Sequence, residues 1–325
     1  MVIGIGYECS DGSIGSCGAG KFGREWLGRP EGLARTMLDA DPRASDSLDD
    51  FSARPFSVIV PVYNEALGLA QRAKALIDGL PKGCEIMFVC NGCTDESEAI
   101  LRATVGMKAK VLKTEQGKAR AIRYGEAHTA LLPRFYVDSD VAISGYDLAR
   151  LDSHLRDGVE LVSPKIDFDL AGASWAARQL STFWRSLPHA RSAAFHHVVG
   201  VGKGGRTRWQ TFPDVIADDL FIEAQMRPSE KRIIDDVIVI SCPPKGAWQW
   251  IRVRARWQQG VCQLRQLGVE LPASQGQRTA ILLAMSRPRT MLQASLYIAA
   301  NVIARAILLF SRNREAEWYR DPTTR

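Results

Sequence analysis

Several patterns that would fix the class of this protein at once are missing from its sequence. No positively charged segment followed by an apolar stretch opens the chain, so no secretory signal is predicted. The seven cysteines are scattered. Cys90 and Cys93 have CxxC spacing, but no second CxxC or histidine pair completes a zinc site. We therefore expect a reducing, cytoplasmic location, with a redox pair at this spacing as the open alternative.

A Walker loop is also missing. The segment 198–205 has four glycines within six residues, but not the Gly-x-x-x-x-Gly-Lys-Ser/Thr spacing. Its glycines would let the backbone approach a ligand closely. His196 and His197, just before it, have no partner at metal-ligand spacing, so we interpret them as structural.

Charge of either sign is not in large excess, since the net charge is +6 over 325 residues. The excess is uneven, because residues 245–325 hold thirteen Lys and Arg against four Asp and Glu, whereas 56–244 hold 23 of each. A positive C-terminal part predicts an anionic partner there, such as phosphate, phospholipid or nucleic acid. A solvated basic face is equally consistent.

Two parts of the chain differ in pattern. Residues 1–55 are rich in Gly, Ser and Asp without a sustained period, which predicts a flexible leader. From Phe56, short apolar runs alternate with helical segments, which indicates βαβ units and a mostly parallel sheet. The expected elements are strand 57–62, helix 65–79, strand 85–90, helix 95–104, strand 108–113, helix 117–129 and strand 134–137.

Polar residues follow three of these strands, at 63–65, 91–95 and 138–140. Ligands of such sheets bind beyond the carboxyl ends of the strands. Asp138 and Asp140 are two apart at a strand end, so both carboxylates can point into one cleft. Such a pair suits Mg²⁺ or Mn²⁺ carrying a substrate diphosphate, although a turn rich in Asp and Ser would look the same.

Four segments together resemble a known family. The run Val58–Glu65 resembles the opening strand of family-2 inverting glycosyltransferases of the GT-A fold, and Asn91–Asp95 lies where these enzymes carry Asp-Gly-Ser-x-Asp. Gly117-Lys118-Ala119 and Asp138-Ser139-Asp140 resemble the Gly-Lys stretch and the Asp-x-Asp metal motif. The resemblance covers about residues 56 to 260. It implies a GT-A-like, Rossmann-like sheet flanked by helices, and metal-assisted transfer of a sugar with inversion.

The resemblance also implies roles for individual residues. Tyr63 and Glu65 would meet the nucleotide base and ribose, although Glu65 could instead be a favourable charge at a helix start. Asn91 replaces a carboxylate by an amide, which changes the hydrogen bonds offered to the base. Lys118 would meet the diphosphate, or be an ordinary surface lysine. The implied donor-binding residues are Pro61, Tyr63, Asn64, Glu65, Asn91, Lys118, Asp138 and Arg256, and the implied metal ligands are Asp138 and Asp140.

A second acidic pair follows at Asp218 and Asp219. It resembles the Glu-Asp pair from which the family draws its general base, with Asp218 in place of the Glu and Asp219 in the position of the base. Inverting transfer needs a carboxylate that takes the proton of the acceptor hydroxyl as it attacks. A helix start with acidic residues is the alternative.

The C-terminal side continues the pattern with strands 159–165 and 232–241 and helices 171–187 and 247–267. Arg256-Trp257 resembles the end of the family's Gln-x-x-Arg-Trp motif, but Val253 stands at the Gln position, which puts processive synthesis in doubt. The resemblance leaves Arg256 to meet the diphosphate and Trp257 to stack on the acceptor, with a basic outer helix as the alternative.

Residues 290–310 are long enough to span a bilayer, but Gln293, Asn301 and Arg305 interrupt their apolarity. With arginines at both ends, we expect a helix lying on anionic lipid, with packing on the catalytic domain as the alternative.

We therefore expect a leader at 1–55, a catalytic domain at 56–270 and a basic, apolar helical tail at 271–325. Residues 56–140 would bind the nucleotide sugar and 141–270 the acceptor. The expected function is glycosyl transfer in cell-envelope polysaccharide or glycolipid synthesis, onto a glycan or lipid-linked acceptor and without nucleic acid. The alternatives are a sugar nucleotidyltransferase, which would carry a Gly-rich loop ending in Arg after its first strand, and an inactive nucleotide-sugar-binding protein.

Overall fold

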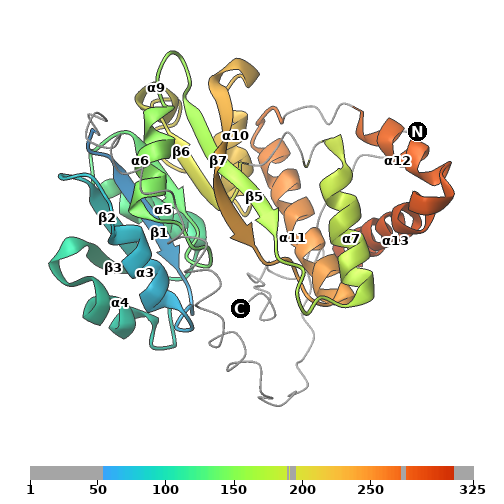
Figure 1. The fold of residues 1–325 in the computed structure, drawn as a ribbon, viewed down its shortest axis with the longest axis horizontal. Helices are drawn as coiled ribbons and strands as arrows, with labels where there is room; N and C mark the ends of the chain where they lie inside the picture. The colour runs from blue at the N-terminus through green and yellow to red at the C-terminus, as the bar shows by residue number, and fades with distance from the viewer. Residues whose placement is uncertain (1–53, 189, 191–194, 272–275, 311–325) are drawn as a thin grey trace, which may run out of the picture. The chain divides into compact units, whose positions relative to one another are not determined.

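The computed structural model describes residues 54–310, except 189, 191–194 and 272–275 (Figure 1). Apart from its last two residues, the leader expected at 1–55 lies outside the described residues. The described chain contains a seven-stranded sheet in the order β3-β2-β1-β4-β6-β5-β7. The strands are β1 (Ser57–Val62), β2 (Glu85–Asn91), β3 (Lys110–Thr114), β4 (Arg134–Val137), β5 (Leu161–Phe168), β6 (Val198–Val201) and β7 (Lys231–Ser241).

The sheet is mostly parallel and flanked by helices, as the sequence predicts. Among the described strands β6 alone runs antiparallel to its neighbours β4 and β5. One face is covered by α3 (Leu69–Ile77), α4 (Ser97–Val105) and α6 (Gly145–Ser153). The other face is covered by α5 (Lys118–Ala127), α10 (Asp218–Ala224) and the end of α11 (Ala247–Gln266). The alternating side chains of β1 and β2 contribute to both cores.

Helix boundaries differ from the prediction where the backbone turns. The helix expected from residue 65 begins at Leu69, because Asn64 and Gly68 adopt positive φ angles of 51° and 70°. The helix expected from Asp95 begins at Ser97, because the Asp95 carboxylate instead accepts hydrogen bonds from the backbone N–H of Ser97 and Ala66.

The strand β6 is not among the expected elements, because the glycines of 198–205 are interpreted from the sequence as backbone that approaches a ligand. Gly200 lies in the middle of the sheet, where a Cβ atom would come within 2.4 Å of the Phe135 ring. The missing side chain therefore makes room for an aromatic core residue on the neighbouring strand.

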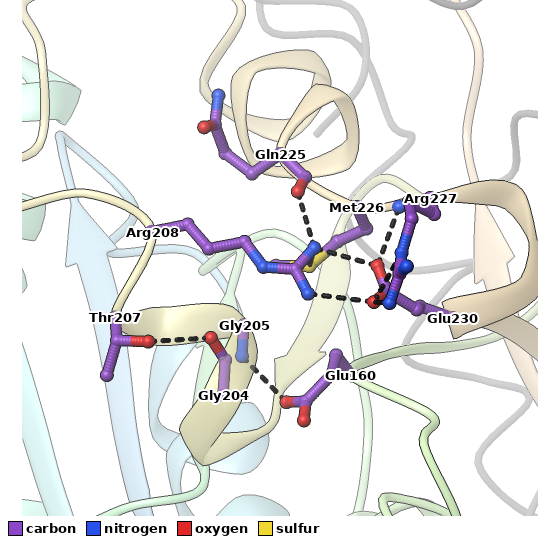
Figure 2. Close-up of polar contacts among 9 residues, drawn as sticks. All are labelled: Glu160, Gly204, Gly205, Thr207, Arg208, Gln225, Met226, Arg227 and Glu230. Carbon is purple, nitrogen blue, oxygen red and sulfur yellow. Dashed lines mark hydrogen bonds and ion pairs between the residues drawn. The ribbon is translucent and has the colours of Figure 1, made fainter.

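The expectation that the glycines of 198–205 approach a ligand is not what the structure shows. The glycines that follow β6 lie just before and within the short helix α9 (Lys203–Arg206), where they surround the carboxylate of Glu160. This carboxylate accepts from Gly205 N–H at 2.7 Å (Figure 2). Glu160 directly precedes β5, so this contact lies at the amino edge of the parallel strands.

A second carboxylate lies at the same edge, directly before β7. Glu230, in the 3-10 helix η4 (Pro228–Glu230), accepts from both terminal nitrogens of Arg208 at 2.7 and 2.8 Å and from Arg227 at 2.6 Å (Figure 2). We call Glu160, Arg208, Arg227 and Glu230 the amino-edge cluster.

The remaining helices form a third core. The helices α7 (Trp175–Ser186), α11 and α13 (Pro288–Phe310) pack together, and α12 (Gln277–Met285) packs on α13. Within the described residues, α13 is the one helix long and apolar enough to cross a membrane, and 33% of its most apolar 18-residue window is buried.

Candidate active site

The three polar strand tips are joined by hydrogen bonds, as their common edge predicts. The side-chain amide oxygen (Oδ1) of Asn64 accepts from the backbone N–H of Thr94 at 2.8 Å. The Asn91 side-chain amide donates to the Val62 carbonyl at 2.8 Å, and its oxygen accepts from Gly117 N–H at 3.2 Å. These contacts fix the first two tips and the start of α5 as one unit.

Asn91 is buried at 3% exposure, and both ends of its amide are used within the protein. The Asn91 side chain therefore links the end of β1 to the start of α5 at the carboxyl edge of the sheet. Tyr63 remains half-exposed at the first tip, where its hydroxyl accepts from Gln116 at 3.3 Å, and Pro61 is buried within β1.

The first and third tips are joined through an arginine that the sequence prediction missed. Arg72 of α3 donates to the Ser139 carbonyl at 2.6 Å and pairs with the Glu65 carboxylate at 3.3 Å. Glu65 is 3% exposed. Arg72 and Glu65 thus position the loop that carries Asp138 and Asp140.

His197, interpreted from the sequence as structural, contacts this loop. Its Nδ1 lies 3.1 Å from Asp138 Oδ2, and its Nε2 lies 2.8 Å from the Ser241 hydroxyl at the end of β7. The residue has a φ of 63°, in the left-handed region, and its carbonyl accepts from Asp138 N–H at 2.7 Å. Strained non-glycine backbone is found preferentially at functional sites.

Asp138, Asp140 and His197 offer three ligand atoms that all lie within 4.8 Å of one another. Two carboxylates and an imidazole suit Mn²⁺, and the two carboxylates suit Mg²⁺. Although Asp140 is exposed on its outer side, the loss of water around its carboxyl raises its pKa, and the charge of Asp138 raises it further. Burial would also raise the pKa of Asp138, but the Lys118 ammonium and His197 hold it well below its usual range. The donor set therefore fits a divalent cation.

Lys118 begins α5, as predicted, and its ammonium joins the two acidic pairs. Its Nζ lies 2.7 Å from Asp138 Oδ1 and 2.9 Å from Asp218 Oδ2. Burial lowers the pKa of Lys118, yet the surrounding aspartates raise it well above its usual range, so the side chain is charged. We call Lys118, Asp138, Asp140, His197, Asp218 and Asp219 the carboxyl-edge cluster.

Asp218 and Asp219 begin α10 but differ in environment. Asp218 is 7% exposed and paired with Lys118. Asp219 is half-buried, and burial together with the charge of Asp218 raises its pKa to about 6. A carboxylate with this pKa is a stronger proton acceptor than an ordinary aspartate.

Arg256 and Trp257 lie on α11, which packs against the loop before this acidic pair. A Cβ atom on Gly260, one turn after Arg256, would come within 2.7 Å of Ala217, and Gln263 of α11 accepts from Ile216 N–H at 2.9 Å. Trp257 is 36% exposed, and its ring centroid lies 5.4 Å from that of Trp184. Trp184 is 6.4 Å from His196, whose ring is 4.9 Å from His197. A chain of aromatic rings thus connects Trp257 with the metal-ligand candidates.

Comparison with known proteins gives a family and a fold. Residues 57–209 match the model of glycosyl transferase family 2. Among solved structures, a mannosyltransferase from Pyrobaculum calidifontis in complex with GDP-mannose and Mn²⁺ is similar, with a TM-score of 0.52 and 20% identity over 89% of this chain and 87% of that one. Glucosyl-3-phosphoglycerate synthase from Mycobacterium tuberculosis, with Mn²⁺, UDP-glucose and phosphoglyceric acid, has a TM-score of 0.47 and 15% identity over 67% and 81% of the two chains. No curated protein matches significantly.

Proposed function

We propose that this chain, whose residues 57–209 belong to glycosyl transferase family 2, moves a sugar from a nucleotide-diphosphate sugar to an acceptor hydroxyl. The transfer would invert the anomeric carbon and use Mg²⁺ or Mn²⁺. The similar mannosyltransferase binds GDP-mannose and Mn²⁺, which supports this donor class and metal. The observation that carries the proposal is the meeting of Asp138, Asp140 and His197 with Asp218 and Asp219 around one lysine.

In this proposal residues 56–140 bind the donor. Tyr63 and Asn64 meet the nucleoside at the first tip, and Lys118 offers a positive charge to the diphosphate. The position of Lys118 at the start of α5, beside Asp138 at the end of β4, supports this role. Glu65 and Asn91 act by holding the tips in place, since both side chains are buried and bonded to neighbouring tips.

Asp138, Asp140 and His197 would hold the divalent cation. When bound, the ion offsets the negative charge on the departing diphosphate and orients it. Ser241 holds the other ring nitrogen of His197, which fixes the orientation of the imidazole.

Asp219 is the proposed general base, with Asp218 as its neighbour. Burial, and next the charge of Asp218, raise the pKa of Asp219, while Lys118 pairs with the Asp218 carboxylate. As the acceptor oxygen attacks the anomeric carbon from the face opposite the diphosphate, Asp219 takes the hydroxyl proton and the carbon–oxygen bond to the diphosphate breaks. Arg256 would meet the released diphosphate.

The acceptor side comprises residues 141–270, with Trp257 as the stacking residue. An aromatic face suits a sugar ring or the lipid-proximal part of a lipid-linked acceptor. Together with the basic C-terminal part, this favours glycan or glycolipid synthesis at the inner face of the cell envelope, with residues 271–325 as a membrane-associated tail.

The testing experiment is nucleoside diphosphate release by purified protein across a panel of nucleotide sugars, with Mn²⁺, with Mg²⁺ and with chelator. We expect metal-dependent release from one donor, even when water replaces the acceptor, and anomeric analysis of the product would show inversion. Donor binding by calorimetry without release, with every acceptor class supplied, would instead identify an inactive binding protein.

A further inference from the structure

The helix α13 has two faces of different character. Its inner face packs on α7 and α11, and its buried members are Ala294, Tyr297, Ala300, Asn301, Ala304 and Leu308. The inner face includes polar contacts, because Arg254 of α11 donates to Asn301 at 2.9 Å and to the Tyr297 hydroxyl at 3.1 Å, and Gln258 donates to Asn301 at 3.1 Å. These buried hydrogen bonds fix the helix along the catalytic part of the chain.

The opposite face of α13 is exposed and almost wholly apolar. Positions separated by three and four residues fall on one side of a helix. The exposed residues from 291 onwards are Met291, Leu292, Ser295, Ile298, Ala299, Val302, Ile303, Leu309 and Phe310. Only Ser295 among them is polar, and exposure reaches 58% at Val302 and 67% at Leu309. The neighbouring helix α12 exposes Leu282 and Leu283 as well. We call these residues the outer face.

An outer face of this size requires a partner. A helix of 23 residues is about 35 Å long, so the exposed apolar strip extends well beyond the scattered apolar residues of ordinary protein surfaces. A spanning helix is not the answer, because crossing a bilayer would break the buried hydrogen bonds of Arg254 with Asn301 and Tyr297.

The charges around the outer face indicate which partner it is. Residues 276–310 contain four arginines and no Asp or Glu. Arg278 on α12 and Arg287 and Arg289 at the α12–α13 junction are all exposed. A second copy of the chain, placed symmetrically on this face, would offer the arginines no carboxylate from α12 or α13, so it lacks complementary charge. An anionic lipid surface offers both the apolar layer and the negative charge.

We propose that the outer face of α12 and α13 docks the protein flat onto a bilayer surface that carries anionic lipid. The apolar side chains enter the headgroup boundary, and the arginines meet the lipid phosphates. The catalytic part of the chain, fixed to the inner face through Arg254, is thereby held at the membrane. This proposal rests on the membrane-associated tail of the proposed function and names its surface and lipid, while its test is independent of the reaction that the carboxyl edge performs.

The test is co-flotation of the full chain with vesicles of phosphatidylcholine alone or of phosphatidylcholine mixed with phosphatidylglycerol. We expect flotation with the anionic vesicles only. The double variant Val302→Ser with Leu309→Ser should weaken binding roughly tenfold or more. The matched control, Leu67→Ser with Met107→Ser, changes two side chains that are 70% and 104% exposed elsewhere and should bind as the parent does.

The charge contribution is tested separately. Replacing Arg287 and Arg289 by Gln should weaken binding to anionic vesicles roughly fivefold for each arginine, and added salt should weaken the parent likewise. The control replaces the exposed Arg156 and Lys108 by Gln and should bind normally.

Several results would overturn the proposal. They are no flotation of the parent, equal flotation on both vesicle types, or equal losses in the outer-face and control variants. A parent dimer that the Val302→Ser, Leu309→Ser variant converts to monomer would assign the outer face to a second copy instead. Circular dichroism melts of each variant show that the chain remains folded, independently of any transferase activity.

Discussion

The two edges of the sheet each carry a group of charged side chains, but their balance differs. In the amino-edge cluster, Glu230 is surrounded by Arg208 and Arg227, and its pKa lies well below the usual range because both guanidinium groups bond to it. In the carboxyl-edge cluster, four aspartates share Lys118 and His197. Two of these aspartates, Asp140 and Asp219, have raised pKa values.

The carboxylate at the amino edge is bonded in a way that stabilises the fold, whereas the carboxylates at the carboxyl edge are available for chemistry. A fully bonded carboxylate has little to gain from a ligand. Carboxylates held close together with too few cations destabilise the folded chain, and they persist in sites that bind a cation or move a proton. The imbalance at the carboxyl edge is therefore the physical basis of the proposed function.

The largest effect is expected from removing the proposed metal ligands. Replacing Asp138 and Asp140 by Ala should abolish the Mn²⁺-dependent tightening of nucleoside diphosphate binding, because the remaining imidazole cannot hold the ion alone. Calorimetric titration with and without Mn²⁺ measures this. Metal-independent binding by the parent would count against the assignment.

Asp219→Asn should lower kcat by roughly 10²–10⁴-fold while donor binding is kept, because the amide cannot accept the hydroxyl proton. It should also raise the melting temperature, since burial and Asp218 disfavour the charged carboxylate. Asp214→Asn is the matched control, because the Asp214 side chain is 74% exposed. Its carboxylate makes a long ion pair, 3.8 Å from the Arg123 guanidinium. Near-normal turnover in Asp219→Asn would place the base at Asp218 or elsewhere.

Glu230→Gln should have the opposite pattern, with a loss of about 1–3 kcal/mol in the free energy of unfolding and turnover preserved in the folded protein. The lowered pKa means that the carboxylate stabilises the fold above its unfolded pKa of about 4.3. The difference between variant and parent in denaturant melts should therefore shrink as the pH falls below that value. A stable but inactive variant would link the amino edge to catalysis.

The smallest effect is one of pH. With a pKa of about 6, Asp219 loses its charge as the pH falls through 6, so kcat/KM should decline below that pH by about tenfold per unit. Burial is the main cause of the shift, with the charge of Asp218 next. A flat profile down to pH 5 would mean that Asp219 is not the base or is ionised throughout turnover.

Much of the fold could be predicted because the strands of the first half are continuous apolar runs. The strand 134–137 was predicted to the residue, and the common edge of the three polar tips follows from parallel topology. Asp138 and Asp140 were singled out because their spacing alone implies a shared side.

The contacts that could not be predicted depend on register between distant segments. His197 meets Asp138 across 59 positions, because β6 pairs antiparallel with β4 and Val137 lies opposite Val198. The glycines around 200 are interpreted from the sequence as backbone that approaches a ligand, so neither this strand nor the approach of His197 is predicted. Nothing in the sequence around Arg72 and Arg254 distinguishes them from other arginines. Only the structure shows that Arg72 holds the loop of Asp138 and Asp140 and that Arg254 holds α13.

The most direct test of the charge imbalance is the melting temperature as a function of Mn²⁺ concentration. The ion should raise the melting temperature of the parent and of Glu230→Gln by the same increment, because both retain the carboxyl-edge cluster. It should leave the variant with Asp138 and Asp140 replaced by Ala unchanged. Equal rises in all three proteins, or no rise in the parent, would contradict the account.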